Sequence, residues 1–129
     1  MRIEVAHRPA YAMATVHLSP GETCVAEAGA MIAMDSHVQM ETSAAKPGEG
    51  LLGGLLGGLK RMVAGESFFQ NRFRSPDRPG TVTFAPTLPG DIVAHELTGG
   101  TLILQSAAYL CCADSVTVDA KWGGARSFF

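Results

Sequence analysis

Residues 15–42 read TVHLSPGETCVAEAGAMIAMDSHVQMET, and the pattern of this stretch decides the fold class. Val16 and Leu18 alternate with polar residues, as inward and outward side chains do along a half-buried β-strand. The Pro-Gly pair at positions 20 and 21 predicts a turn. The small and apolar residues 23–34 then predict a strand that enters the core.

Two features of this stretch concern the backbone and the direction of side chains. Gly29, in the middle of residues 23–34, predicts a bulge or a close approach of another segment. Residues 36–42 alternate again, which places Val38 and Met40 inward.

Similar short runs occur along the rest of the chain. They predict further strands within residues 2–18, 67–73, 81–84, 91–97, 101–105, 107–112 and 115–119. Many short strands separated by Pro-Gly or Gly-Gly pairs indicate an all-β fold, either a double-stranded β-helix or a two-sheet β-roll.

An internal repeat organises these strands. Its offset is 78 residues, which is 95 minus 17 for the pair His17 and His95. The same offset pairs Gly21 with Gly99, Thr23 with Thr101, Val25 with Ile103, Gly29 with Ala107, Ile32 with Leu110, Val38 with Val116, and Glu41 with Asp119. We therefore expect residues 1–129 to form one β domain, with a first repeat at about 1–84 and an incomplete second repeat at about 85–129. Strands needed to complete the second sheet are missing, which predicts a fragment of a longer protein or an edge covered by another subunit.

The glycine-rich stretch GEGLLGGLLGGLKRMVAGESFF, residues 48–69, differs from everything around it. Its leucines fall on one stripe of a helix, and its glycines bare a strip of backbone for close packing. Interior glycines each disfavour a helix by about 0.8–1 kcal/mol relative to Ala, so we expect a short helical insertion that is ordered only when its leucines are covered. The predicted contact residues are Leu51, Leu52, Gly54, Leu55, Leu56, Gly58, Leu59, Lys60 and Arg61.

Three interpretations of this insertion compete. It packs on its own protein or on a neighbouring subunit, it lies on a membrane surface through leucines followed by basic residues, or it binds phosphate. Gly48, Gly50 and Gly53 satisfy GxGxxG, but no strand and helix of a βαβ unit flank them. A membrane span is excluded because about 20 continuous apolar residues are needed.

Composition narrows the class of protein. With 129 residues and a net charge of −2, the chain forms an ordinary domain without the basic excess of nucleic-acid binders. Three cysteines, an odd number, argue against a disulfide framework and for a reducing compartment. The first residues lack a signal-peptide pattern, so we expect a cytoplasmic protein, or one peripheral on the inner membrane if the leucine segment contacts lipid.

The residues that could carry chemistry do not form a recognisable site. None of His7, His17, His37 and His95 has the His-x-His or His-x-carboxylate spacing of a β-helix metal site. Cys111 and Cys112 are adjacent, so on a strand they point to opposite faces. We therefore predict no catalytic, cofactor-binding or metal-binding residues. Ser67 lacks both the nucleophile-elbow spacing and an evident base. We interpret the repeat-equivalent carboxylates Glu41 and Asp119 as a solvated strand end. The basic cluster of Arg72, Arg74, Arg78 and the pair Lys60-Arg61 is interpreted as a solvated loop rather than a phosphate-backbone groove.

Four segments resemble the bacterial branch of the mitochondrial-biogenesis family named for altered inheritance of mitochondria (protein twenty-four of that series). They are PGETCVAEAGAMIAMDSHVQMET, GLLGGLKRMVAGESFFQNRF, PGTVTFAPTLPGDIVAHEL and DAKWGG, and together they span nearly the whole chain. The resemblance implies a double-stranded β-helix or sandwich similar in fold to the trp RNA-binding attenuation protein, with oligomerisation. It also implies members longer than this chain, and a role in organisation rather than catalysis.

We therefore expect a non-enzymatic, homo-oligomeric scaffold or assembly protein whose leucine and glycine segment contacts a subunit or a membrane. Two alternatives remain open. One is an RNA-binding or small-ligand-binding module of the attenuation-protein fold, which rests on fold likeness alone. The other is a metal-dependent enzyme of the double-stranded β-helix type, which the histidine spacing disfavours.

Overall fold

The fold is all-β, as the alternating sequence pattern predicts. A computed structural model describes residues 1–43, 69–105 and 107–118, and within these ranges it contains strands and no helix. The strands are β1 (Arg2–Ala6), β2 (Met13–Leu18), β3 (Thr23–Glu27), β4 (Met31–Met34), β5 (Gln39–Ser43), β6 (Gln70–Arg74), β7 (Gly80–Phe84) and β8 (Cys111–Ala113).

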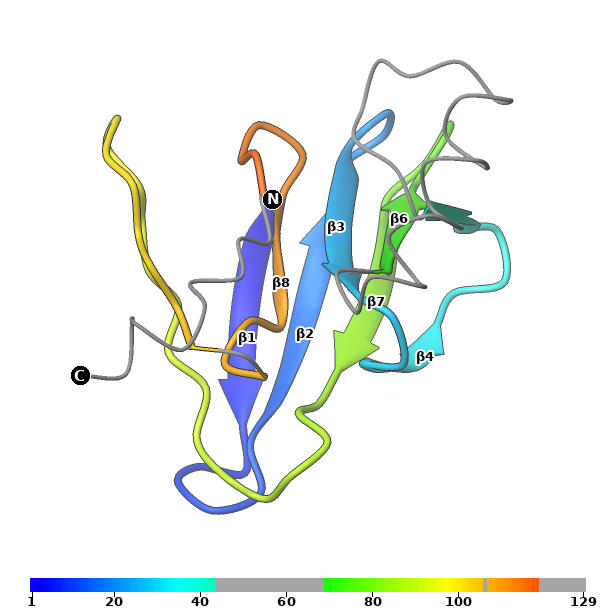
Figure 1. Ribbon diagram of the computed structural model, residues 1–129. Coiled ribbons are helices and arrows are strands. Elements are labelled where there is room, and N and C mark those ends of the chain that lie inside the picture. Colours follow the sequence, from blue (N-terminus) through cyan, green and yellow to red (C-terminus); the bar gives the residue numbers. More distant parts are fainter. Residues whose placement is uncertain (44–68, 106, 119–129) are drawn as a thin grey trace, which may run out of the picture.

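These strands form two four-stranded sheets in which every pairing is antiparallel (Figure 1). The first sheet has the order β1-β2-β7-β4, and the second has the order β5-β6-β3-β8. The chain changes sheet between β2 and β3, between β3 and β4, between β4 and β5, between β6 and β7, and between β7 and β8. Each sheet is therefore assembled from segments distant in sequence, which agrees with the predicted two-sheet architecture.

Two of the segments that connect one sheet to the other are hydrogen-bonded to each other. Gly21, in the turn from β2 to β3, has a φ of 80° and donates its N–H to the carbonyl of Ser75 at 2.6 Å. Ser75 lies between β6 and β7 and donates its own N–H to the Glu22 carbonyl at 3.1 Å. These two connecting segments therefore lie side by side. The strands that they join also pair, β2 with β7 and β3 with β6.

The core lies between the sheets and is fixed by strand alternation. Every second residue of β2 and of β7 is buried, because one face of each strand points inward. Phe73 from the second sheet meets Phe84 from the first in an edge-to-face contact, with ring centroids 5.3 Å apart and planes at 72°. Both side chains are fully buried, so this pair joins the two sheets.

The structure corrects the prediction of one strand over residues 23–34. That stretch forms two strands, β3 and β4, separated by a tight turn at residues 28 and 29. Gly29 has a φ of 90°, and Ala30 donates its N–H to the Glu27 carbonyl at 3.2 Å. Glycine adopts this left-handed conformation without steric cost, so here it marks a turn rather than a bulge within a strand.

Val38 and Met40 are both predicted to point into the core, but only Val38 is buried. Met40 is 44% exposed. Met40 is the cross-strand partner of the buried Phe73 and shares its face. It remains exposed because β5 is the outer strand of its sheet, so the core does not extend beyond it.

The predicted strands at residues 91–97 and 101–105 do not form ladders. Residues 91–105 make a hairpin-shaped excursion, yellow in Figure 1, without strand pairing. Residues 115–118 are not a strand either, and residue 119 lies outside the described residues. Alternation describes the two faces of a segment, whereas a strand also needs a neighbour to which it can hydrogen-bond. The predicted glycine-rich helix likewise falls outside the described ranges.

Candidate interaction surface

Large apolar side chains are exposed on the outer strands of both sheets. Ile32 and Met34 on β4 are 52% and 37% exposed, and Met40 lies on β5. Strand β4 ends the first sheet and β5 ends the second, and the two strands are consecutive in the chain. We call Ile32, Met34 and Met40 the β4–β5 surface. Met side chains adapt to varied partners, which suits a contact surface.

The connection between β4 and β5 is held firmly by hydrogen bonds to β7. Asp35 Oδ2 accepts the Thr81 N–H at 2.8 Å and the Thr81 hydroxyl at 3.0 Å, while the Asp35 N–H donates to the Thr81 carbonyl at 3.0 Å. The backbone hydrogen bond from Thr81 lowers the pKa of the Asp35 carboxyl. Val38 donates its N–H to the Asp35 carbonyl at 3.0 Å, which closes the turn. The two outer strands are therefore fixed relative to the core.

This connection packs so tightly on β7 that a glycine is required there. A Cβ on Gly80 would lie 2.7 Å from both Ser75 Oγ and Val38 Cγ2, and 3.0 Å from His37 Nε2. His37 Nε2 also lies 3.0 Å from the carbonyl oxygen of Pro79. His37 is thus occupied in supporting the turn.

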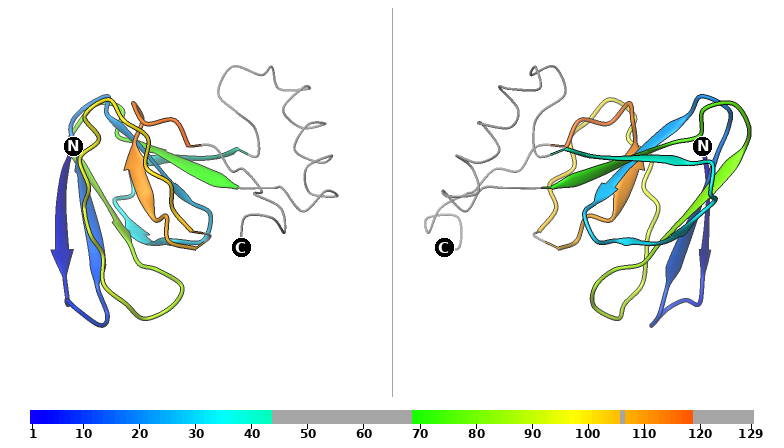
Figure 2. Two further views of the ribbon diagram at one scale, coloured as in Figure 1. Left: turned by 60° about the vertical axis from the view of Figure 1, so that its left-hand side comes forward. Right: turned by 90° about the vertical axis from the view of Figure 1, so that its right-hand side faces the viewer.

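The predicted leucine and glycine contact residues, 51–61, lie outside the described residues. The structure nevertheless shows where their segment starts and finishes. Ser43 at the end of β5 is the cross-strand partner of Gln70 at the start of β6, and Thr42 Oγ1 donates to Asn71 Oδ1 at 2.9 Å. Residues 44–69 therefore connect two paired strand ends, which point away from β1 (Figure 2). The segment begins directly after β5, one of the two strands of the β4–β5 surface.

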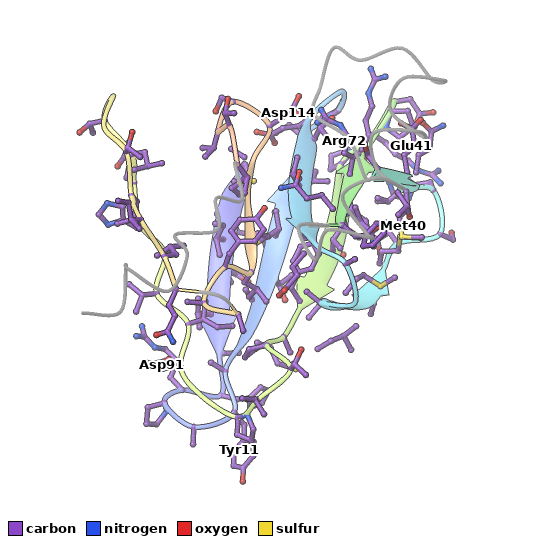
Figure 3. The ribbon with its side chains drawn as sticks, in the orientation of Figure 1. Tyr11, Met40, Glu41, Arg72, Asp91 and Asp114 are labelled. Atoms are coloured by element: carbon purple, nitrogen blue, oxygen red, sulfur yellow. The ribbon has the colours of Figure 1, made fainter. Side chains whose placement is uncertain are left out.

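Charged residues line the same part of the second sheet. Arg72 on β6 is the cross-strand partner of Glu41 on β5, and its guanidinium donates a hydrogen bond to Asp114 (Figure 3). The predicted basic cluster is therefore partly neutralised at Arg72, and its Lys60 and Arg61 lie outside the described residues. Such pairing reduces the positive field that a phosphate-backbone groove would need.

The histidines are dispersed over the fold. His17 Nε2 lies 3.2 Å from Glu4 Oε2 on the neighbouring strand β1, whereas His95 lies in the exposed excursion. Within residues 1–43, 69–105 and 107–118, no group of three or more His, Cys, Asp or Glu side chains could hold a metal ion.

The three cysteines are free thiols. Cys24 is fully buried, and this burial raises its pKa to about 12. Burial likewise raises the pKa of Cys111 to about 11. Cys112 Sγ lies 3.3 Å from the Tyr109 hydroxyl, which donates to the Val25 carbonyl at 3.0 Å. Thiols with such raised pKa values are poor nucleophiles near neutral pH, so they act here as packing groups.

Sequence reasoning missed a surface groove between two loops. It has a volume of about 260 Å³ and lies between residues 11–13 and 85–90. The exposed side chains of Leu88 and Tyr11 are among its lining residues, and Tyr11 is labelled in Figure 3. The loops are tied together by the Ala12 N–H, which donates to the Gly90 carbonyl at 3.0 Å. The proline-rich run after β7 could have signalled a structured loop here, but nothing local linked it to Tyr11.

The excursion at residues 91–105, which we call the arm, is a second exposed apolar region. Val93 is 77% exposed and Ile103 is 91% exposed, and Leu102 and Leu104 are also exposed. The base of the arm is fixed by two hydrogen bonds of 2.9 Å from the Arg8 guanidinium to the Asp91 carboxylate. Exposed apolar side chains gathered in one extended segment are typical of binding surfaces.

The described residues contain no helix with the length and hydrophobicity needed to cross a membrane.

Comparisons with known proteins identify the family. An uncharacterised protein of Streptococcus pyogenes serotype M6 is 32% identical over 111 residues, which cover 85% of this chain and 44% of that protein. A crystal structure of the protein SPYM3_0169 from Streptococcus pyogenes is similar with a TM-score of 0.69 at 28% identity, over 88% of this chain and 50% of that one. The chain thus spans about half the length of these relatives. The family model described as Mitochondrial biogenesis AIM24 matches residues 3–129, and the chain belongs to that family.

Proposed function

We propose that this protein is a non-enzymatic, homo-oligomeric scaffold or assembly protein of the cytoplasm. The observation that supports the proposal is the β4–β5 surface, where Ile32, Met34 and Met40 are exposed on two consecutive outer strands. Burying one such side chain contributes about 1.5–3 kcal/mol, so covering this surface would favour association.

The leucine and glycine segment is the second contact element in this proposal. It follows β5 directly in sequence, and its ends are held together by the pairing of Ser43 with Gln70. Its leucines would either add to the subunit contact or place the protein peripherally on an anionic inner-membrane surface. Apolar residues followed by Lys60 and Arg61 suit the boundary between lipid headgroups and acyl chains.

Solution mass tests the oligomeric part of the proposal. Light scattering coupled to size exclusion should give a multimer for the native chain and a monomer for an Ile32→Lys, Met34→Lys variant. Leu88→Lys is the matched control, because Leu88 is exposed on a different part of the molecule. A native chain that stays monomeric as its concentration is raised would contradict the proposal.

Liposome flotation separates the two roles of the leucine segment. Vesicles that contain anionic lipid should carry the native chain, and replacement of Leu51, Leu52, Leu55 and Leu56 by Ser should abolish flotation if the segment contacts lipid. A Ser-substituted chain that floats equally well argues against the membrane role. If the substitution changes the mass of the native multimer, the segment belongs to the subunit contact.

The groove beside Tyr11 supports a small-ligand function less well than the β4–β5 surface supports association. Its volume of about 260 Å³ is below the roughly 300–1,000 Å³ that is typical of ligand pockets.

A further inference from the structure

The arm and the segment that follows it repeat backbone features of the first half of the chain. At the offset of 78 residues, the left-handed residue Gly21, with a φ of 80°, corresponds to Gly99, with a φ of 90°. Gly29, also at 90°, corresponds to Ala107, whose φ of 67° is unusual for a residue with a Cβ. The positions of both turns therefore recur at the spacing seen in the sequence.

Backbone hydrogen bonds recur at the same offset. The N–H of residue 30 donates to the carbonyl of residue 27 at 3.2 Å, and that of residue 108 to the carbonyl of residue 105 at 3.1 Å. The N–H of residue 38 donates to the carbonyl of residue 35 at 3.0 Å, and that of residue 116 to the carbonyl of residue 113 at 3.0 Å. At this offset residues 91–96 correspond to β2, residues 101–105 to β3, and the first two residues of β8 to the last two of β4.

If the two halves of the chain are equivalent, the pairing of β3 with β8 has a counterpart between residues 101–105 and β4. This counterpart is not formed within the described residues of one chain. Strand β8 pairs with β3 through Val25 opposite Cys112 and Ala26 opposite Cys111. Moving each partner by 78 residues, β8 back to β4 and β3 forward to the arm, places Ile103 opposite Met34 and Leu104 opposite Ala33. Strand β4 ends its sheet, so among the described residues its outer edge is open, and within the same ranges the arm has no strand partner.

We propose that residues 101–105 of one copy of this chain pair antiparallel with β4 of a second copy. The contact brings together two exposed apolar segments, with Ile103 of one copy opposite Met34 of the other. Pairing also satisfies the backbone N–H and C=O groups that both edges expose. Because each copy has one arm and one β4, two such contacts form around a twofold axis and close a dimer.

The topology favours a second copy over the chain's own β4. The arm begins at Asp91, which Arg8 holds next to the end of β1, and it returns to β8. Strand β1 is the edge opposite β4 in the first sheet, and β8 is the edge opposite β5 in the second. The arm therefore leaves and rejoins the fold on the side away from β4, as Figure 1 shows. This inference rests on the proposed homo-oligomer and adds its interface and register.

Cysteine cross-linking between two single variants tests this pairing. Chains carrying Met34→Cys are mixed with chains carrying Ile103→Cys, and glutathione disulfide is added to form disulfide bonds. We expect a disulfide-linked dimer that contains one chain of each kind, because opposed residues of neighbouring strands bring their Cβ atoms within about 4.5–5.5 Å. The native chain, which keeps its three cysteines, gives the background, and Val93→Cys mixed with Met34→Cys is the off-register control.

The remaining outcomes decide against the pairing. A Met34→Cys, Ile103→Cys double variant that cross-links only within one chain shows that the arm reaches its own β4. Equal cross-linking by the Val93→Cys control shows that no defined register exists. If light scattering shows a dimer but the mixed variants do not cross-link above background, the oligomer stands and this interface is wrong; a monomeric chain overturns both.

Discussion

Replacing Phe73 tests whether the two sheets are held together as the structure indicates. Phe73 and Phe84 are both fully buried, come from different sheets, and meet edge to face at 5.3 Å. Truncation of a buried Phe to Ala costs about 3–5 kcal/mol, because the apolar contacts are lost and a cavity remains. Domains of this kind have total stabilities of roughly 5–15 kcal/mol, so Phe73→Ala should remove a large fraction of the free energy of unfolding.

A double-mutant cycle isolates the contact between the two rings. The variants are Phe73→Leu, Phe84→Leu and the combination, since Leu retains much of the apolar volume while it removes the ring. Urea unfolding followed by circular dichroism gives the free energy of each variant. We expect a coupling of about 0.5–1.5 kcal/mol, as measured for other aromatic pairs. Leu88→Ala is the surface control and should change stability by less than about 0.5 kcal/mol.

Two results would refute this reasoning. One is a loss of less than about 1 kcal/mol for Phe73→Ala, which would be too small for a residue at the centre of the core. The other is a coupling that is zero within error, which would mean that the rings do not meet and that the sheets pack differently.

Three further predictions use the backbone, the thiols and a surface ion pair. Gly29→Ala should destabilise the fold by about 1 kcal/mol and Ala107→Gly should stabilise it by a similar amount, because both positions have a positive φ; chemical denaturation of the two variants should therefore give opposite signs. Cys24, with a pKa raised to about 12 and no exposed surface, should react with Ellman's reagent only after unfolding, and rapid reaction of all three thiols in the native state would contradict its burial. The hydrogen bond from the Arg8 guanidinium holds the pKa of Asp91 below its ordinary value of 3.8, so its contribution to stability is present above that pH and is lost as the pH falls through the lower, folded-state pKa. Thermal melts of Asp91→Asn should accordingly differ from the native chain at neutral pH and converge with it in acid, and a difference that persists in acid would contradict this assignment.

Segments other than β4 of a second copy are alternative partners for the arm. An exposed strand edge with apolar side chains is a template for pairing with any compatible strand. The relatives are about twice as long as the part that this chain matches, so in a longer chain another segment could compete for the same edge. The register with β4 distinguishes a foreign segment from β4 of this chain, because only β4 places Met34 opposite Ile103. The mixed single variants distinguish a second copy from the chain's own β4.

The sequence by itself determined the fold class and several local features. The alternation at Val16 and Leu18 depends only on the two faces of a strand, and the structure has β2 with those residues buried. The Pro-Gly pair before β3 specified a turn because Gly21 tolerates the left-handed conformation that the turn requires. The family resemblance was likewise visible from residue identities alone, since the matched segments span nearly the whole chain.

The tertiary structure decided which strands have partners and which surfaces remain open. Residues 101–105 have the apolar composition of a strand, yet within the part of the chain that the structure describes they pair with no other strand, because pairing depends on a neighbour that local pattern cannot specify. Met40 has the correct face but remains exposed at an outer strand. Arg72 lies beside Asp114, 42 residues away, which no local spacing indicated. Periodicity encodes the direction of each side chain, whereas burial and pairing depend on contacts between segments that are distant in sequence.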